Sequence, residues 1–174
     1  MEIAEQLVRK RGIPDDHRTM SVSCERIADI LRGKGDLSGA LKLYQKDMEI
    51  REQLIRERGT LDDRRILRIS YNKVADILRA QGDHAGAWRC IRRGTEIQEQ
   101  LVRERGAVSD CDRLATFCGV LAMQSTLPVA ERFTYARQGL KLSEQLLKVT
   151  GLDRYQNSSE IFRQLIKALE KHNG

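Results

Sequence analysis

The sequence predicts an all-α fold, a right-handed superhelical stack of antiparallel helix pairs, and three observations support this. The phrase EIREQLIRERG at 49–59 recurs 47 residues later as EIQEQLVRERG at 96–106, and an earlier copy, EIAEQLVRKRG, stands at 2–12. A second phrase, ADILRGKGDLSGA at 28–40, returns as ADILRAQGDHAGA at 75–87 after the same step. Only two prolines occur in 174 residues, so long stretches are free to be helical. A period of this length indicates stacked helical units.

The first helix of each unit is expected just before a glycine–aspartate pair. Its apolar residues recur at spacings that fit one face of a helix. In the two copies these residues are Val22, Ile27, Ala28 and Leu31, and then Ile69, Val74, Ala75 and Leu78. Gly35 and Gly82 are predicted to take the left-handed conformation that ends a helix. Asp36 and Asp83 are predicted to cap the helix that follows.

The second helix is predicted over about 37–58 and carries two apolar rows. One row is Leu37, Leu41, Tyr44, Met48 and Ile55, and the other is Ala40, Leu43, Ile50 and Leu54. So wide an apolar arc needs cover from its partner helix and from the next unit. Glu52 and Arg56 stand four residues apart with the acid first, the favourable order for an ion pair on a solvated face. Glu99 and Arg103 repeat this pair.

The repeats divide a single expected domain, residues 1–174, into five parts. These are a partial-repeat tail (1–12), a first repeat (17–59), a second repeat (64–106), a divergent third repeat (110–151) and a capping helix (155–174). The third repeat keeps Leu121 in phase but ends two residues early, and its turn is STLP, in which Pro128 suits the start of a new helix. The capping helix, at about 157–171, places five apolar residues on one side: Ile161, Phe162, Leu165, Ile166 and Leu169.

Two stretches resemble the tetratricopeptide repeat: SVSCERIADILRGKGDLSGALKLYQKDMEI (21–50) and RISYNKVADILRAQGDHAGAWRCIRRGTEI (68–97). In the first, the family's packing and turn positions hold Ile27, Ala28, Gly35-Asp36, Ala40 and Tyr44. In the second they hold Tyr71, Val74, Ala75, Gly82-Asp83, Ala87 and Ile91. The chain lacks the family's closing proline, and its second helix is longer than in the usual unit of about 34 residues. The resemblance therefore indicates a long-helix variant with a 47-residue period.

Composition favours a soluble, helix-rich protein, with 40% hydrophobic and 32% charged residues. The net charge of +6 comes from interspersed basic and acidic residues, which indicates a solvated surface. The four cysteines, Cys24, Cys90, Cys111 and Cys118, form no CxxC pair, which disfavours a zinc site. Cys24 and Cys118 are expected to be buried. No apolar run approaches a membrane span and the start has no signal-peptide core, so we expect a cytoplasmic protein that does not enter the membrane.

No catalytic motif is found, and we predict that the protein is not an enzyme and uses neither a cofactor nor a metal. The sequence has no phosphate-binding glycine loop, no HExxH and no GxSxG. The three histidines lie far apart, at His17, His84 and His172. Three serines near the expected helix starts are predicted to cap helices or to bond the backbone: Ser21, Ser23 and Ser70.

The resemblance implies a concave groove lined by the first helices, with partner-binding side chains between the packing positions. Here these are Glu25, Asp29, Arg32, Asn72, Asp76, Arg79, Thr116 and Met123. The four-residue step from Glu25 to Asp29 makes an acidic stripe, which an arginine row flanks. The alternative is that these acids and arginines only pair with one another. A clamp for a terminal carboxylate is disfavoured because Asp29 and Asp76 would repel it.

We therefore predict a non-catalytic protein–protein interaction scaffold that binds a peptide or a helix in its groove. One alternative is the sensory or regulatory repeat domain of a larger, bacterial multidomain effector or signalling protein. A second is an RNA-binding helical repeat, suggested by the basic clusters at 64–68 and 89–93 beside Trp88. Nucleic acid is disfavoured because no aromatic row alternates with the basic residues. A homodimer through the uncovered N-terminal helix, with Ile3 and Leu7, stays open.

Overall fold

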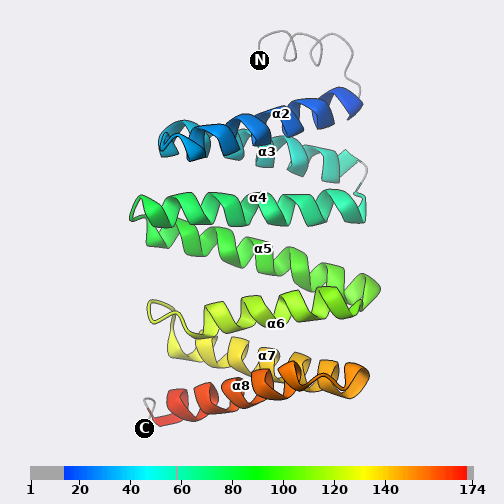
Figure 1. Cartoon of the computed structure of the whole chain (residues 1–174), viewed down its shortest axis with the longest axis vertical. Helices are drawn as coiled ribbons and strands as arrows, with labels where there is room; N and C mark the ends of the chain where they lie inside the picture. Colours follow the sequence, from blue (N-terminus) through cyan, green and yellow to red (C-terminus); the bar gives the residue numbers. More distant parts are fainter. Residues whose placement is uncertain (1–13, 58, 172–174) are drawn as a thin grey trace. The chain divides into compact units, whose positions relative to one another are not determined.

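The computed structural model describes residues 14–57 and 59–171, and over these ranges it contains helices and no strand. The all-α prediction is therefore confirmed. The helices are α2 (Pro14–Gly33), α3 (Leu37–Glu57), α4 (Leu61–Ala80), α5 (His84–Arg105), α6 (Val108–Ala122), α7 (Val129–Thr150) and α8 (Asp153–Lys171), as drawn in Figure 1. The predicted partial-repeat tail at 1–12 lies outside the described residues.

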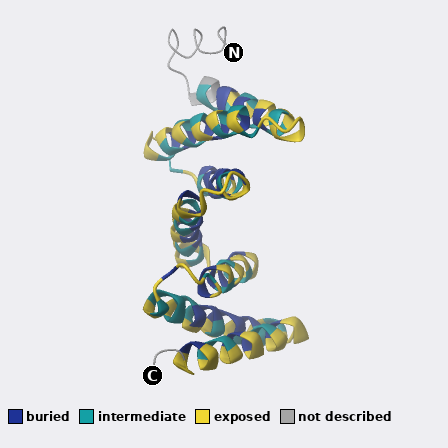
Figure 2. Ribbon diagram, turned by 90° about the vertical axis from the view of Figure 1, so that its left-hand side faces the viewer, coloured by how far each residue is buried: buried dark blue, intermediate teal, exposed yellow. Residues whose placement is uncertain are grey.

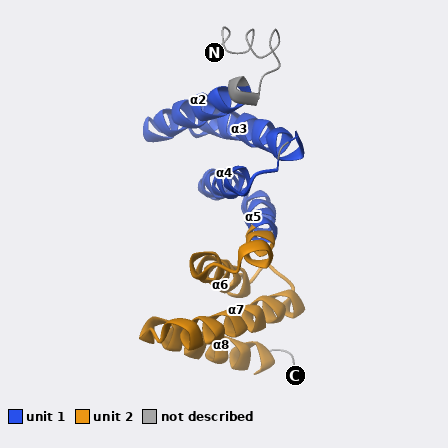
Figure 3. Cartoon of the chain, turned by 90° about the vertical axis from the view of Figure 1, so that its right-hand side faces the viewer, with its two compact units in different colours: residues 1–97 blue, residues 98–174 orange. Residues whose placement is uncertain are grey.

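The chain forms two compact units, which Figure 3 colours separately: residues 1–97 (unit 1) and residues 98–174 (unit 2). Unit 1 contains α2, α3, α4 and the first part of α5, and unit 2 contains the end of α5 with α6, α7 and α8. Within unit 1, α3 packs against both α2 and α4, and within unit 2, α7 packs against both α6 and α8. The single domain with its five parts and the right-handed superhelix stay predictions.

Glycine and aspartate form the turn between the two helices of a pair, as the sequence predicted. Gly35 and Gly82 have φ angles of 83° and 84°, in the left-handed region where a side chain is strained. Asp36 then caps α3, because its Oδ1 accepts a hydrogen bond from the backbone N–H of Gly39 at 2.8 Å. A Cβ at Gly39 would overlap the Asp36 carboxylate. The second glycine of the phrase GDxxGA thus leaves room for the cap.

The core of unit 1 lies where α3 is held between α2 and α4. Its buried cluster consists of Ala28, Ala40, Tyr44, Val74 and Ile77. Two residues that the sequence assigned to the buried face of α2 are instead exposed: Val22 by 41% and Ile27 by 37%. Figure 2 shows the corresponding mixture of buried and exposed positions along each helix. That part of the prediction is wrong, because the apolar spacing does not show which sides of a helix a neighbour covers.

The core of unit 2 surrounds a fully buried thiol, Cys118, which packs with Leu114, Ala115, Leu142 and Phe162. Cys24 is equally buried in unit 1, so the prediction that both thiols are buried is confirmed. A second cluster of unit 2 contains Ala122, Ala136 and Leu169.

The last helix differs from its prediction in two respects. It begins at Asp153, earlier than the expected 155–157, because Gly151 (φ 67°) ends α7 and the buried Tyr155 already lies in the first turn of α8. Phe162 and Leu169 are buried as expected, but Ile161 is 59% exposed. The ring of Phe162 occupies the space where a Cβ at Gly139 of α7 would stand. Close packing of α7 against α8 therefore depends on this glycine.

Candidate functional site

The predicted acidic stripe on α2 is bound by cations within unit 1. Lys73 Nζ on α4 donates hydrogen bonds to Glu25 Oε1 at 2.8 Å and to Asp29 Oδ2 at 3.0 Å. Glu25 also accepts a hydrogen bond from Arg51 of α3 at 3.0 Å. Arg32, the third predicted residue of this helix, lies 3.7 Å from Asp29. The structure thus brings Glu25, Asp29 and Arg32 together, but as members of an internal ion-pair network.

The network continues into the interior through Asp47, which has no exposed surface. Asp47 Oδ2 accepts a hydrogen bond from Ser70 of α4 at 2.6 Å, and Oδ1 accepts one from Ser21 of α2. Arg51 Nε lies 2.8 Å from the same carboxylate, and Arg51 is only 5% exposed. The prediction that Ser21 and Ser70 serve caps or the backbone was therefore incomplete, since both mainly bind Asp47. A single buried carboxylate joins three helices.

The apolar-row analysis of the sequence missed Asp47 and Arg51. The buried residues of α3 follow a spacing of three and four: Ala40, Tyr44, Asp47, Arg51 and Leu54. This spacing marks one face of a helix, and it could have located both charged residues on that face. One further indication in the sequence was that Asp47 and Arg51 stand four residues apart, so they can form an ion pair with each other when both are buried.

The contacts of the ion-pair network shift the pKa values of Asp29 and Lys73. Partial burial of Asp29 disfavours its charged form, but the hydrogen bonds from Tyr44 and Lys73 and the charge of Lys73 outweigh this, so the pKa of Asp29 lies below its ordinary value. Partial burial of Lys73 likewise favours the neutral amine, but its bonds to Glu25 and Asp29 raise the pKa of Lys73. Both groups are therefore held in their charged forms.

The predicted residues on α4 make a smaller set of contacts. Asp76 and Arg79 form an ion pair three residues apart, with both side chains about half exposed. Asn72 Oδ1 lies 3.5 Å from the position that a Cβ would take at Gly94 on α5, so this part of Asn72 faces the second helix. Of the three, Asp76 and Arg79 offer surface to a partner, and their charges balance.

Two exposed apolar residues lie on the same stripes as the predicted groove residues. Val22 stands three residues before Glu25, and Ile69 stands three residues before Asn72, so each shares a helical face with them. Ile69 is 39% exposed, close to the value for Val22. The sequence placed both residues in the core, and their spacing to the groove residues was the signal that pointed to the other face.

In unit 2, the predicted residues Thr116 and Met123 lie on or next to α6. Both are exposed, and Met123, at 61%, follows the last residue of the helix. Thr116 Oγ1 donates to the backbone carbonyl of Asp112 at 3.1 Å. Val120, between them on the same face, is 36% exposed. On this face, the exposed apolar side chains of Val120 and Met123 stand beside the hydroxyl of Thr116.

The basic clusters that suggested nucleic acid are engaged in structural contacts. Arg64 donates to the carbonyl of Gly59, and Arg68 is 5% exposed. Arg93 pairs with Glu96 at 2.6 Å. Arg64 and Arg68 therefore serve contacts within unit 1, whereas Arg93 stays exposed beside its acidic partner.

Over residues 14–57 and 59–171, no three His, Cys, Asp or Glu side chains are grouped so as to hold a metal ion. Within the same ranges, no helix has both the length and the apolar character needed to cross a membrane.

Comparison with known proteins supports the repeat. A family model described as the tetratricopeptide repeat matches residues 22–55, which cover most of α2 and α3, so the predicted resemblance is confirmed for that segment. The 47-residue period stays a prediction. No curated protein matches the chain.

Two solved structures that the chain matches over most of its length are a filament and a designed helical repeat protein. A "DHF58 filament" is 16% identical with a TM-score of 0.44, over 99% of this chain and 93% of the other. The "de novo designed helical repeat protein DHR64" is 15% identical with a TM-score of 0.44, over 98% of this chain and 90% of the other.

Proposed function

We propose that this chain, which carries a tetratricopeptide repeat at residues 22–55, is a non-catalytic protein–protein interaction scaffold. Its partner is a peptide or a helix that lies along the exposed stripes of α2 and α4. The observation that carries the proposal is the pairing of exposed apolar side chains, Val22 and Ile69, with charged residues on the same helical faces.

The contacts of unit 1 refine which residues recognise the partner. Glu25 and Asp29 are neutralised by Lys73 and Arg51, so they act mainly in holding the helices together. Asp76, Arg79 and the two apolar residues remain accessible. We therefore propose apolar anchoring at Val22 and Ile69, with the charged pair on α4 adding specificity and speed of encounter more than affinity. Thr116 and Met123 are proposed to bind partner side chains on unit 2.

The test begins with selection of peptides that bind the immobilised full chain from a displayed random library. Selected peptides are then titrated against Ile69→Asp and Asp76→Lys. Both side chains are exposed, so the helical signal and Tm should stay nearly unchanged while affinity falls roughly tenfold or more, about 1.4 kcal/mol.

Matched controls carry the same substitutions on other surfaces. Val149→Asp changes an exposed apolar residue of α7, and Glu49→Lys changes an exposed acid of α3. Both controls should bind the selected peptides as the wild-type chain does. Peptides that bind all four variants equally would show that recognition does not use the stripes of α2 and α4.

A further inference from the structure

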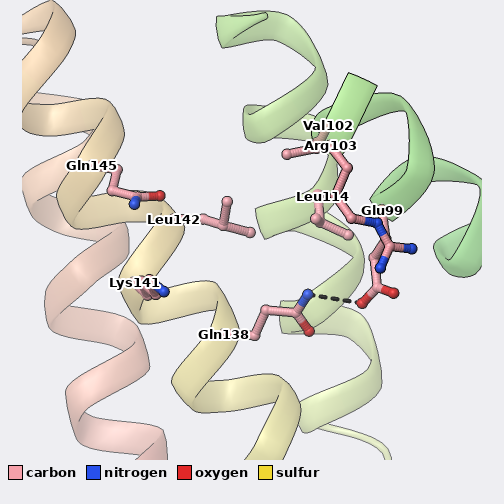
Figure 4. Close-up of a pocket in the computed structure, with 8 residues that line it drawn as sticks. All are labelled: Glu99, Val102, Arg103, Leu114, Gln138, Lys141, Leu142 and Gln145. Carbon is pink, nitrogen blue, oxygen red and sulfur yellow. Dashed lines mark hydrogen bonds between the residues drawn. The ribbon is translucent and has the colours of Figure 1, made fainter. Parts of the chain in front are cut away.

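A hollow of about 330 Å³ opens on unit 2 between the end of α5 and α7, as Figure 4 shows. Its floor is apolar: Leu114 of α6 and Leu142 of α7 are buried, and Val102 of α5 is half-buried. The two walls are joined by a hydrogen bond from Gln138 Nε2 on α7 to Glu99 Oε1 on α5, at 2.8 Å. The hollow is thus built from side chains of one compact unit.

Two cations line the hollow above this floor, Arg103 on α5 and Lys141 on α7. Both side chains are exposed, and neither forms an ion pair with any residue in the part of the chain that the structure describes. The sequence predicted that Glu99 would pair with Arg103, but Gln138 is the residue that bonds its carboxylate. Gln145, also exposed, adds an amide to the lining. Two cations that form no ion pair within the described residues therefore adjoin an apolar floor, and the Glu99 carboxylate, which accepts from Gln138, lies in the same lining.

We propose that this hollow binds a small apolar anion: a carboxylate carried on a short aliphatic or aromatic body. The body would displace water from the three apolar floor residues. The guanidinium of Arg103 can hold a carboxylate through two parallel N–H donors, and Lys141 adds a second charge. The volume lies at the lower end of the range of small-molecule sites, about 300–1,000 Å³, so the ligand must be small.

This site is independent of the proposed scaffold function. It uses none of the residues proposed to contact a peptide on α2, α4 or α6. Its failure would leave the scaffold proposal intact, and the reverse also holds.

The first experiment titrates the full ¹⁵N-labelled chain with sodium hexanoate and, as an uncharged match, with hexanamide. Backbone amides at Val102, Leu114 and Leu142 should shift and saturate with hexanoate, with a Kd on the order of 1 mM. Hexanamide should bind at least about fivefold more weakly because it lacks the charge. Absence of shifts at these amides, or equal binding of the two compounds, would overturn the proposal.

Variants that remove positive charge distinguish binding of hexanoate in the hollow from its general attraction to a basic protein. The double variant Arg103→Gln/Lys141→Gln should bind hexanoate roughly five- to tenfold more weakly. The control Arg105→Gln/Lys148→Gln removes the same charge from exposed positions of the same two helices, which do not line the hollow. It should bind as the wild-type chain does. Equal loss in both double variants would reject a specific site.

A further arm identifies the source of the carboxylate. A tripeptide that ends in leucine is titrated with a free and with an amidated C-terminus. Tighter binding of the free-acid peptide than of hexanoate assigns the site to a peptide end, and weaker binding assigns it to a small free acid. Equal binding of the free and amidated peptides would count against carboxylate recognition.

Discussion

At the scale of single residues, Asp47 shows how much one buried charge can specify. Its carboxylate binds Ser21 of α2, Ser70 of α4 and Arg51 of its own helix. A buried carboxylate is tolerated only when its oxygens are satisfied, and here three partners satisfy them. One repeat later, Gly94 takes the place of Asp47 and Arg68 the place of Ser21. The stem of Arg68 lies 3.8 Å from the position of a Gly94 Cβ, so a large side chain fills the space there.

Replacing Asp47 with alanine should strongly destabilise unit 1. The change removes one of the two acidic partners of the buried Arg51, leaving Glu25, and takes away the carboxylate to which Ser21 and Ser70 donate. Breaking a buried ion pair typically costs about 3–5 kcal/mol. Urea unfolding followed by circular dichroism would measure the loss. The control Asp62→Ala removes an acid whose side chain is 85% exposed, and it should change the free energy of unfolding by less than about 0.5 kcal/mol. Similar effects of the two variants would contradict the central role of Asp47.

Tyr71 should make stability fall at alkaline pH. Burial, the hydrogen bond to Glu52 at 2.5 Å and the charge of Glu52 raise the pKa of Tyr71 to about 12, from an ordinary value of about 10. A raised pKa contributes stability that is fully present below about pH 10 and is lost as the pH rises through about 12. Tyr71→Phe lacks this loss, although it forfeits the hydrogen bond at neutral pH.

The free-energy difference between wild type and Tyr71→Phe should therefore shrink by about 1 kcal/mol between pH 9 and pH 11. Urea unfolding at both pH values would measure it. A difference that stays constant with pH would show that Tyr71 titrates normally in the folded chain.

At the scale of helices, the same sequence phrase has different surroundings in α2 and α4. Ile27 and Ile30 of α2 correspond to Val74 and Ile77 of α4, one period later. In α4 both residues are buried against Ala40 and Tyr44 of α3, whereas Ile30 is 57% exposed. The repeated motif supplies an apolar face in each copy, and only the neighbouring helix decides whether it becomes core.

A pair of alanine substitutions tests this difference. Ile77→Ala should lower the free energy of unfolding by about 2–5 kcal/mol, because it leaves a cavity among packed side chains. Ile30→Ala removes the same atoms from an exposed position and should cost less than about 0.5 kcal/mol. Chemical unfolding of the two variants under identical conditions gives the comparison. Equal decreases in the free energy of unfolding would mean that Ile30 is covered by other atoms in solution.

Glu52 and Glu99, near the C-terminal ends of α3 and α5, have partners other than those that the sequence predicted. Glu52 and Glu99 were expected to pair with arginines four residues on, along a solvated face. Instead Glu52 bonds Tyr71 on the next helix, and Glu99 bonds Gln138 within unit 2. The glutamates of the repeated phrase therefore connect neighbouring helices, whereas the sequence predicted that they would only stabilise their own helix.

At the scale of the whole molecule, the sequence predicted where most of the helices lie, but it did not predict which of their side chains are exposed. The glycine–aspartate turns predicted a second helix over about 37–58, where α3 runs over 37–57, and they predicted the end of α2, because caps and left-handed glycines act locally. The exposure of Val22 and the burial of Arg51 depend on packing between helices distant in sequence. The candidate site stays a predicted set of positions, and the sequence did not reveal the ion pairs that join Glu25 and Asp29 to Lys73 and Arg51.

The two buried thiols allow the units to be followed separately. Cys24 reports on unit 1 and Cys118 on unit 2, and both have no exposed surface. Burial, followed by the charge of Glu99, raises the pKa of Cys118 to about 12, so this thiol reacts when its unit opens. In repeat architectures, stability is a sum of local terms, so a local defect should open its own surroundings first.

Asp47→Ala should therefore speed maleimide labelling of Cys24 roughly a hundredfold, as about 3 kcal/mol implies, with less than about a threefold effect at Cys118. Phe162→Ala, in the core cluster that contains Cys118, should give the reverse pattern, because it removes a buried ring worth about 3–5 kcal/mol. Pulse labelling under native conditions, read by mass spectrometry of the two cysteine peptides, measures both rates. If each variant accelerates both thiols equally, the chain opens as one cooperative block, and the division at residue 97 has no counterpart in its stability.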